Sequence, residues 1–263
     1  MSAYDAIIEK LFLEGFKKGL SEIEFEREDL SRVAGELGVS LPKNLGDIIY
    51  SFRYRKPLPK RIVDTAPEGL SWVIRSKGRA AYAFCLTRRA IIEPTRLLSE
   101  AKLLDATPGI VEKYAMTDEQ SLLAKVRYNR LVDIFLGIAC YSLQNHLRTA
   151  IPGMGQIETD ELYVGVDANG AHYIIPVQAK GNSDTVGIIQ LEQDFELCRH
   201  RFPAMIARPL AIQFVESNLI AMFSFTQTPE GVRIEREKHY RLVSPEGLSD
   251  EEIKRYATMQ LDR

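Results

Sequence analysis

The segment from Asp160 to Gly181 constrains the fold more than any other part of the chain. It contains two apolar runs, Asp160–Asp167 and Ile174–Gly181, joined by the sequence Ala168-Asn169-Gly170-Ala171. Asn-Gly between such runs is a strong short-range signal for a β-hairpin. We therefore predict two antiparallel strands, with an acid opening the first strand and polar residues closing the second.

The polar residues of this hairpin are spaced for a common site. Gln178 and Lys180 are two residues apart, so their side chains share one face of a strand, and Asp160 lies at the same end of the hairpin. A carboxylate, an amide oxygen and an ammonium there can hold a divalent cation, a scissile phosphate and an attacking water. The alternative is that Asp160 and Lys180 are ordinary solvated residues at strand ends.

Two features favour the site. The apolar run Tyr173–Val177 is typical of a buried strand, and polar residues at the end of a buried strand often line a site. The local charge also favours a metal site, because residues 151–200 contain eight acidic residues against two basic ones, Lys180 and Arg199.

The run Val177-Gln178-Ala179-Lys180, with Asp160 before it, resembles the PD-(D/E)xK nuclease superfamily. The match is to the variant in which Gln replaces the second acid, as in Mrr-type restriction nucleases and their type II relatives. The resemblance implies that Asp160, Gln178 and Lys180 are catalytic. It implies that Asp160, Gln178 and the Ala179 carbonyl bind Mg²⁺ (or Mn²⁺), and that Lys180 orients the water. Because the amide adds no charge, neighbouring acids are expected to contribute more: Glu158, Glu161 or Glu192.

Composition sets broader limits. A chain of 263 residues is expected to form one large or two smaller domains. Its three cysteines, Cys85, Cys140 and Cys198, are widely spaced in apolar contexts, which predicts buried reduced thiols and a cytoplasmic protein. The N-terminus does not resemble a signal peptide, and no apolar run is long enough to span a membrane.

Charge is distributed unevenly along the chain. The formal net charge is −2, yet residues 51–100 contain eleven basic and four acidic side chains, whereas residues 151–200 contain two and eight. Basic charge is therefore concentrated upstream of the acidic candidate site. A DNA-binding module joined to a metal-dependent catalytic module has this distribution.

The first third of the chain predicts a small α+β domain. Apolar spacing predicts helices over Ala3–Lys18, within Phe25–Leu41 and over Pro42–Arg53. Two β-rich runs follow, residues 70–75 and 80–86, joined by the basic turn Ser76-Lys77-Gly78-Arg79.

This order resembles a winged helix, which implies that residues 1–90 form a winged-helix-like domain. The DNA-binding residues it implies are Lys43, Asn44, Tyr50, Arg53 and Arg55 on the third helix, and Lys77 and Arg79 on the wing. The alternative is that these basic residues are the solvated face of a small domain.

We expect residues 91–116 to be a connector that adds a strand or a short helix. Thr117-Asp118-Glu119-Gln120 is a capping-box start, and apolar spacing predicts a helix from Asp118 to about Arg148, broken near Gly137. A later helix is predicted through Ile188 to about His200. Polar residues on these two helices are candidate accessory residues: Asn145, His146, Arg148, Gln190 and Gln193.

Strand-like runs at residues 207–214 and 219–226 complete the pattern, and the role of residues 231–263 is left open. The expected architecture is α/β. A winged-helix-like α+β domain precedes a restriction-endonuclease-like core, residues 117–263, with a mixed central sheet flanked by helices.

The resulting hypothesis is a metal-dependent endonuclease of restriction or defence type that acts on double-stranded DNA. A homodimer is the default expectation for an enzyme that cuts both strands, and no membrane partner is expected. Two alternatives remain open at this point. One is a non-catalytic DNA-binding regulator with a nuclease-like fold, and the other is a protein–protein interaction module.

Overall fold

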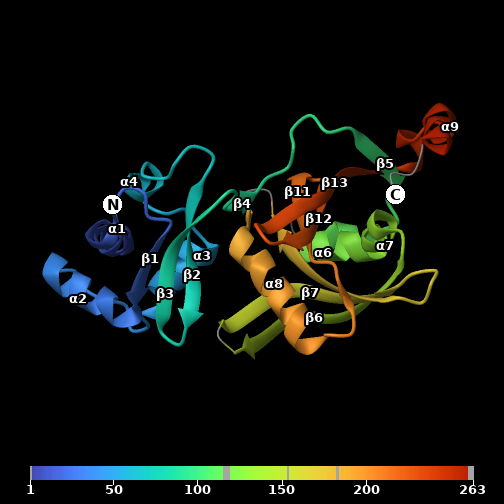
Figure 1. The fold of residues 1–263 in the computed structure, drawn as a ribbon. Helices are drawn as coiled ribbons and strands as arrows, with labels where there is room; N and C mark the ends of the chain where they lie inside the picture. Colours follow the sequence, from blue (N-terminus) through green and yellow to red (C-terminus); the bar gives the residue numbers. More distant parts are fainter. Residues whose placement is uncertain (1, 115–118, 153, 182–183, 260–263) are drawn as a thin grey trace. The chain divides into compact units, whose positions relative to one another are not determined.

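The chain forms two compact units that are each discontinuous in sequence (Figure 1). Unit 1 comprises Met1–Ile92, Arg148–Glu158 and Gly187–Arg201, and unit 2 comprises Glu93–Leu147, Thr159–Val186 and Phe202–Arg263. The structure is a computed structural model that describes residues 2–114, 119–152, 154–181 and 184–259.

Unit 1 begins with helices around a three-stranded antiparallel sheet of order β1-β3-β2. Its elements in chain order are α1 (Ala3–Gly15), β1 (Glu22–Glu26), α2 (Arg27–Leu37), α3 (Gly46–Tyr54), α4 (Lys60–Val63), β2 (Ser71–Gly78), β3 (Ala81–Thr87) and β4 (Ile91–Ile92). The predicted helices and the β2–β3 hairpin are present, whereas β1 was not predicted.

Local signals set the helix ends in unit 1. Ser2 and Asp5 form a reciprocal capping box at the start of α1. Gly38 ends α2 with a left-handed φ of 66°, which glycine adopts without a Cβ clash. The third helix begins at Gly46 and not at the predicted Pro42, because the Asn44 side chain accepts the Gly46 N–H at 3.0 Å and forms a turn first.

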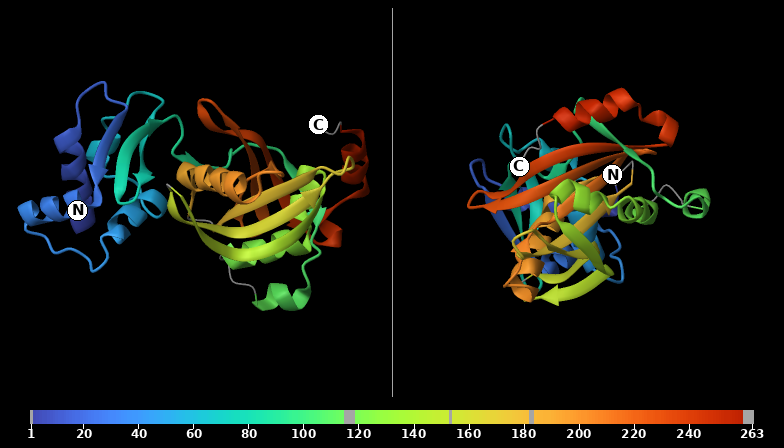
Figure 2. Two further views of the ribbon diagram at one scale, coloured as in Figure 1. Left: turned by 60° about the horizontal axis from the view of Figure 1, so that its bottom comes forward. Right: turned by 90° about the vertical axis from the view of Figure 1, so that its right-hand side faces the viewer.

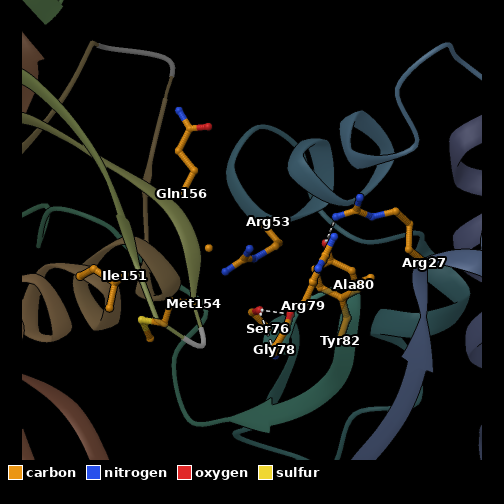
Figure 3. A pocket seen from close by; sticks show the side chains of 11 residues that line it. Arg27, Arg53, Ser76, Gly78, Arg79, Ala80, Tyr82, Ile151, Met154 and Gln156 are labelled. Atoms are coloured by element: carbon orange, nitrogen blue, oxygen red, sulfur yellow. Dashed lines mark hydrogen bonds between the residues drawn. The ribbon is translucent and has the colours of Figure 1, made fainter.

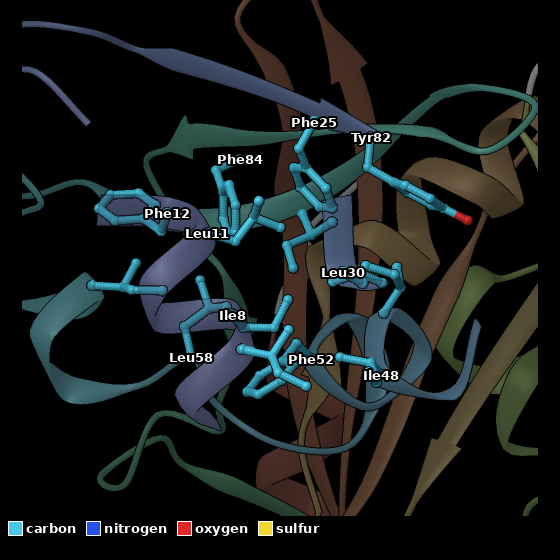
Figure 4. Close-up of a cluster of buried hydrophobic side chains, with 14 of the residues drawn as sticks. Ile8, Leu11, Phe12, Phe25, Leu30, Ile48, Phe52, Leu58, Tyr82 and Phe84 are labelled. Atoms are coloured by element: carbon cyan, nitrogen blue, oxygen red, sulfur yellow. The ribbon is translucent and has the colours of Figure 1, made fainter. Parts of the chain in front are cut away.

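The core of unit 1 lies between the helices and one face of this sheet (Figure 4). Phe12 of α1 packs edge-on against Phe84 of β3 with ring centroids 5.1 Å apart. Leu30 and Ile48 bring α2 and α3 onto the same cluster. Burial of each such side chain contributes about 1.5–3 kcal/mol, so this part of the chain has a core of its own.

Helix α8 (Ile188–Arg201) belongs to unit 1 although it is distant in sequence. Arg75 of β2 donates to both carboxylate oxygens of Glu192, at 2.9 and 2.6 Å. The Tyr54 hydroxyl of α3 donates to Gln193 Oε1 at 3.1 Å. These bonds tie α8 to the N-terminal helices and sheet.

Unit 2 is built around one large mixed sheet. Its elements are β5 (Glu100–Leu104), α5 (Gly109–Tyr114), α6 (Glu119–Tyr128), α7 (Leu131–Leu136), β6 (Ala139–Ile151), β7 (Gly155–Val166), β8 (His172–Lys180), β9 (Val186–Gly187), β10 (Ile206–Ala207), β11 (Leu210–Glu216), β12 (Leu219–Thr228), β13 (Gly231–Val243), the 3₁₀ turn η1 (Pro245–Gly247) and α9 (Asp250–Thr258). The tips of β6 and β7, from residue 148 to residue 158, fall in unit 1.

The strand order is β5-β13-β12-β11-β8-β7-β6, with β10 pairing β8 outside this path. β7 and β8 are antiparallel, β8 and β11 are parallel, and β11, β12 and β13 are antiparallel in turn. The views in Figure 2 show the sheet strongly curved. The expected mixed α/β architecture is therefore present, with the tail as β13 and α9.

Helices α6 and α7 cover one face of the sheet. Leu122, Val126 and Phe135 pack there against Ile175 and Val177 of β8, and all five side chains are at most 1% exposed. This packing fixes α6 against the interior strand β8, which has the candidate residues at its C-terminal end.

The predicted helix from Asp118 to Arg148 is wrong beyond Leu136. Arg130 interrupts the helix with a left-handed φ of 50°, and Gly137 ends it with a φ of 70°. The chain then enters β6, where sheet pairing replaces helical hydrogen bonds, so Asn145, His146 and Arg148 lie on a strand. Thr117 and Asp118 of the predicted capping box lie outside the described residues.

The three cysteines are buried and unpaired, as predicted. Burial raises the pKa of the Cys140 thiol to about 12, which keeps it protonated. In the described part of the chain, every helix is too short or too polar to cross a lipid bilayer.

Candidate active site

The predicted β-hairpin is formed by β7 and β8. Backbone pairing runs from Glu161↔Val177 to Val166↔His172. In the turn, Asp167 Oδ1 accepts the N–H groups of Asn169 and Ala171, each at 2.9 Å. Gly170 has a φ of 78°, so the Asn-Gly signal identified this turn correctly.

The two strands part at Asp160. Among the described residues, the β7–β8 pairing begins at Glu161↔Val177, whereas β8 continues with β11 as far as Gln213↔Lys180. Asp160 Oδ2 accepts the backbone N–H of Ala179 at 2.8 Å. The Asp160 carboxylate thus accepts a backbone N–H of β8, as a backbone carbonyl of a paired strand would. The result is a buried acid beside the end of β8.

Lys180 lies at this end and forms an ion pair with an acid from a distant helix. Its Nζ is 2.6 Å from Glu119 Oε1, at the start of α6, and its side chain is only 13% exposed. Burial acts to lower the pKa of Lys180, but the hydrogen bond to Glu119 and the charges of Asp160 and Glu119 outweigh it. The pKa is raised, so the ammonium stays charged at neutral pH.

The pKa of Asp160 is also raised. Burial is the main cause, and the charge of Glu119 adds to it. The Ala179 N–H and the charges of Lys180 and His146 oppose this shift without cancelling it. Two carboxylates and an ammonium are therefore electrostatically coupled in one place, which is typical of functional sites.

Polar residues of β8 and β11 extend the site. Gln178, on β8, is 1% exposed. Gln213 of β11 is in register with Lys180 and donates to the Asp184 carbonyl at 2.8 Å. Buried amides at a strand end supply oxygen and N–H groups without adding charge.

Glu161, the rival acid, has a different environment. It is fully buried and accepts two hydrogen bonds from Arg127, at 2.9 and 3.1 Å, and one from Ser142 at 2.6 Å. Adjacent strand residues face opposite sides, so Glu161 and Asp160 are separated by the sheet. The geometry favours a structural ion pair for Glu161 and leaves Asp160 at the site.

His146 and Asn145 reach the surroundings of the site from β6. His146 Nε2 lies 2.7 Å from Gln120 Nε2, next to Glu119 in sequence, and its charge acts on Asp160. Its φ of 46° is unusual for a non-glycine residue inside a strand. Asn145 accepts from Arg127 at 3.3 Å.

Four other predicted residues make their contacts within unit 1. Glu158 pairs with Arg148 at 3.0 Å. Gln190 Oε1 accepts the Gly187 N–H at 3.2 Å, and Gln193 accepts from Tyr54. The contacts of Glu158, Arg148 and Gln193 are structural. Gln190 caps the start of α8.

The predicted DNA-binding residues differ in their exposure and in the contacts of their side chains. Lys43, Arg55 and Arg79 are exposed, and Arg55 lies over the Tyr50 ring at 4.8 Å. Lys77 is paired with Glu22 at 2.6 Å, and Asn44 donates to Asp47 at 2.9 Å. Arg53 is half-buried on α3.

The donor set is compatible with a hard cation. Asp160 and Glu119 offer carboxylates, and Gln178 and the Ala179 carbonyl offer neutral oxygens. Mg²⁺ is usually bound through one or two carboxylates with water in the other positions. The described residues contain no group of three or more His, Cys, Asp or Glu side chains arranged for a metal. A cation here would therefore depend on neutral oxygens, water and substrate.

Sequence reasoning missed two residues of this site. In the sequence, Glu119 is part of a helix-start motif, and Gln213 lies inside a strand-like run, so neither position by itself indicates a site. The acid in the first turn of a predicted helix was the available signal for Glu119. Comparisons of the chain with protein-family models, with curated proteins and with solved structures gave no match.

Proposed function

We propose that the chain is a metal-dependent endonuclease acting on double-stranded DNA, with the hydrolytic site in unit 2. The observation that carries the proposal is the meeting of Asp160, Lys180 and Glu119 where β7 and β8 part. Asp160 is held by the Ala179 N–H at 2.8 Å, and Lys180 is held by Glu119 at 2.6 Å. A buried acid and a charged lysine at a strand end match the motif inferred from the sequence.

The chain's own residues would act through charge and position. Lys180 remains protonated and would offset negative charge that develops on a phosphate during hydrolysis. Gln178 and Lys180 lie two residues apart on β8, so both would face the same phosphate. Glu119 would orient Lys180 and restrict its movement.

Asp160, Glu119, Gln178 and the Ala179 carbonyl would hold Mg²⁺ or Mn²⁺. When bound, such an ion polarises a phosphoryl oxygen and lowers the pKa of water. The buried carboxylate of Asp160 is expected to be the strongest of these ligands, because Glu119 already neutralises Lys180.

Unit 1 would recognise DNA. Helices α2 and α3 are joined by residues 38–45 and are followed by the β2–β3 hairpin, an order that supports the winged-helix proposal. Lys43 is exposed just before α3, Arg55 is exposed directly after it, and Arg79 is exposed on the hairpin turn. Such residues would contact phosphates and base edges in a groove.

The test is cleavage by the full-length protein. Supercoiled plasmids, unmodified or carrying methylated bases, are incubated with Mg²⁺ or Mn²⁺, with and without a chelator. Metal-dependent nicking or linearisation that disappears in the Lys180→Ala variant supports the proposal. Cleavage that persists unchanged in a folded Lys180→Ala variant contradicts it.

A second candidate function is a non-catalytic DNA-binding regulator with the same fold. The small number of acidic side chains at the site, among the described residues, favours it. This candidate predicts salt-sensitive DNA binding without cleavage under any metal condition. The remaining alternative, a protein–protein interaction module, would show neither DNA binding nor cleavage.

A further inference from the structure

A polar cavity lies within unit 1 (Figure 3). Its volume is about 350 Å³. Four segments line it: the start of α2, the end of α3, the β2–β3 turn and the tip of the β6–β7 hairpin. The lining residues are Arg27, Arg53, Ser76, Gly78, Arg79, Ala80, Tyr82, Ile151, Met154, Gly155 and Gln156.

The cavity is positively charged. Three arginines, Arg27, Arg53 and Arg79, line it, and the described lining residues include no acid. Among the residues that the structure describes, none of these three guanidinium groups has an ion pair with an acid. Several other basic side chains of unit 1 do form ion pairs with acids: Arg32 lies 2.9 Å from Glu14, and Lys77 lies 2.6 Å from Glu22.

Arg53 carries the strongest indication of a ligand. Its Nε is buried and lacks a hydrogen-bond partner in the described part of the chain. A buried donor without a partner destabilises the fold unless a ligand or water satisfies it. Figure 3 shows the Arg53 side chain extending into the cavity between Gln156 and Arg79.

The surrounding bonds hold the arginines in place. The Arg27 backbone N–H donates to the Ala80 carbonyl at 2.8 Å, and its side chain donates to the Tyr82 hydroxyl at 3.2 Å. The Arg53 guanidinium lies 5.0 Å from the centroid of the Tyr54 ring. Arginines restrained before binding lose less conformational entropy when a ligand arrives.

We propose that this cavity binds the phosphate of a nucleotide, either as part of a DNA strand or as a free mononucleotide. Guanidinium groups form paired hydrogen bonds with phosphate oxygens, which suits the three arginines. Met154 and Ile151 provide an apolar wall, and Gln156 provides an amide, which suits a sugar or a base. The volume falls in the range of small-molecule sites and exceeds the need of a bare phosphate.

The inference deepens the proposed function and rests on it for the DNA arm, but nucleotide binding is measurable without cleavage. The full-length protein in a chelator is titrated with thymidine 5′-monophosphate, thymidine and inorganic phosphate by calorimetry. Binding of the monophosphate and no binding of thymidine are expected. Equal binding of the two would overturn the proposal, because the phosphate would then be irrelevant.

Arg53→Met and Arg79→Gln test the cavity directly. Each is expected to weaken monophosphate binding about tenfold or more, because a charge-assisted hydrogen bond is lost. Arg88→Met, an exposed arginine of unit 1 outside the cavity, should stay within about twofold of the wild type. Arg53→Met should change the melting temperature little, since the buried Nε has no hydrogen-bond partner to lose and only the contact with the Tyr54 ring is weakened. Unchanged binding in both Arg53→Met and Arg79→Gln overturns the proposal.

A competition experiment distinguishes the two sources of the phosphate. If the cavity takes a DNA phosphate, a 20-base-pair duplex displaces the monophosphate, and Arg53→Met weakens duplex binding. If its ligand is a free nucleotide, the duplex does not compete. Monophosphate binding without any DNA cleavage would refute only the nuclease proposal, whereas cleavage with no monophosphate binding would refute only the cavity proposal.

Discussion

Lys180 Nζ lies 2.6 Å from Glu119 Oε1, although the two residues are 61 positions apart in the sequence. The carboxylate comes from the first turn of α6, and the ammonium comes from the last residue of β8. This pair joins the helix that covers the sheet to the strand that carries the candidate motif. It keeps Lys180 charged and gives the site a second carboxylate next to Asp160.

Glu119→Gln tests the contribution of this second carboxylate. We expect cleavage to fall by about tenfold to a hundredfold, because Lys180 loses its charged partner and the site loses one potential cation ligand. Rates are measured on plasmid DNA at several Mg²⁺ concentrations. Glu112→Gln is the control, since Glu112 is an exposed acid near Lys125. Wild-type rates in Glu119→Gln would show that Glu119 has no role in the site.

Lys180→Ala is expected to abolish cleavage and to leave DNA affinity within a few fold. Lys102→Ala is the matched control, because Lys102 also forms an ion pair in unit 2, with Glu252 at 2.8 Å. That variant should cleave normally. Equal loss of cleavage in both variants would indicate a general effect of removing an ion pair.

The same pair predicts a pH dependence of stability. The folded pKa of Lys180 is raised above the ordinary value of 10.5, so its contribution is complete below pH 10.5 and is lost as pH rises through the folded pKa. The melting-temperature difference between wild type and Lys180→Ala should therefore shrink above pH 10.5. A constant difference from pH 8 to pH 11.5 would contradict the raised pKa.

Asp160→Asn should remove cleavage without destabilising the protein. The amide oxygen of Asn can still accept the Ala179 N–H, and the raised pKa of Asp160 means that its ionised form opposes folding above pH 3.8. The melting temperature should stay equal or rise, while Mg²⁺ binding measured by calorimetry weakens. Asp133→Asn is the control, because Asp133 also accepts a strand N–H, from Cys140 at 2.9 Å. The Asp133→Asn variant should cleave DNA normally.

Arg127→Ala tests the buried ion pair on the opposite face. Removing Arg127 leaves the fully buried Glu161 without its cation, so the free energy of unfolding should fall by about 3 kcal/mol. Arg130→Ala breaks a more exposed pair with Asp133 and should lower it by less than about 1 kcal/mol. Urea unfolding measures both. If Glu161→Gln restores much of the stability in the Arg127→Ala background, the loss comes from the unpaired charge.

Arg55→Gln tests DNA contact by unit 1. Arg55 is exposed, and we expect the slope of log affinity against log salt to fall by about one unit if one phosphate contact is lost. Lys77→Gln should change the slope less, because Lys77 is already paired with Glu22. Identical slopes for wild type and Arg55→Gln would remove Arg55 from the DNA interface.

The sequence predicted elements whose signals are local. Asn169-Gly170 specified the turn between β7 and β8, since few residues adopt its backbone geometry. Gly38 specified the end of α2, and apolar spacing specified α1 and α8. The spacing of Gln178 and Lys180 places both side chains on one face at the end of β8, where the candidate site lies. These features depend on neighbours within a few residues.

Features that depend on distant partners were not predictable in the same way. Residues 139–151 continue a helix-like pattern but form β6, because pairing within the large sheet outweighs weak local preference. Arg53 and Gln156 are far apart in sequence, yet both line the polar cavity of unit 1.

Unit 1 also includes α8, which is held there by the bonds between Arg75 and Glu192, and no local signal in the sequence indicates that a segment so distant belongs to it. The sequence by itself determined the hairpin, its motif and the basic N-terminal segment, because alternation, turn chemistry and charge are readable along the chain. Only the tertiary structure decided that Glu119 joins Lys180 and Asp160, because packing of α6 on β8 sets that distance and no spacing rule links residues so far apart.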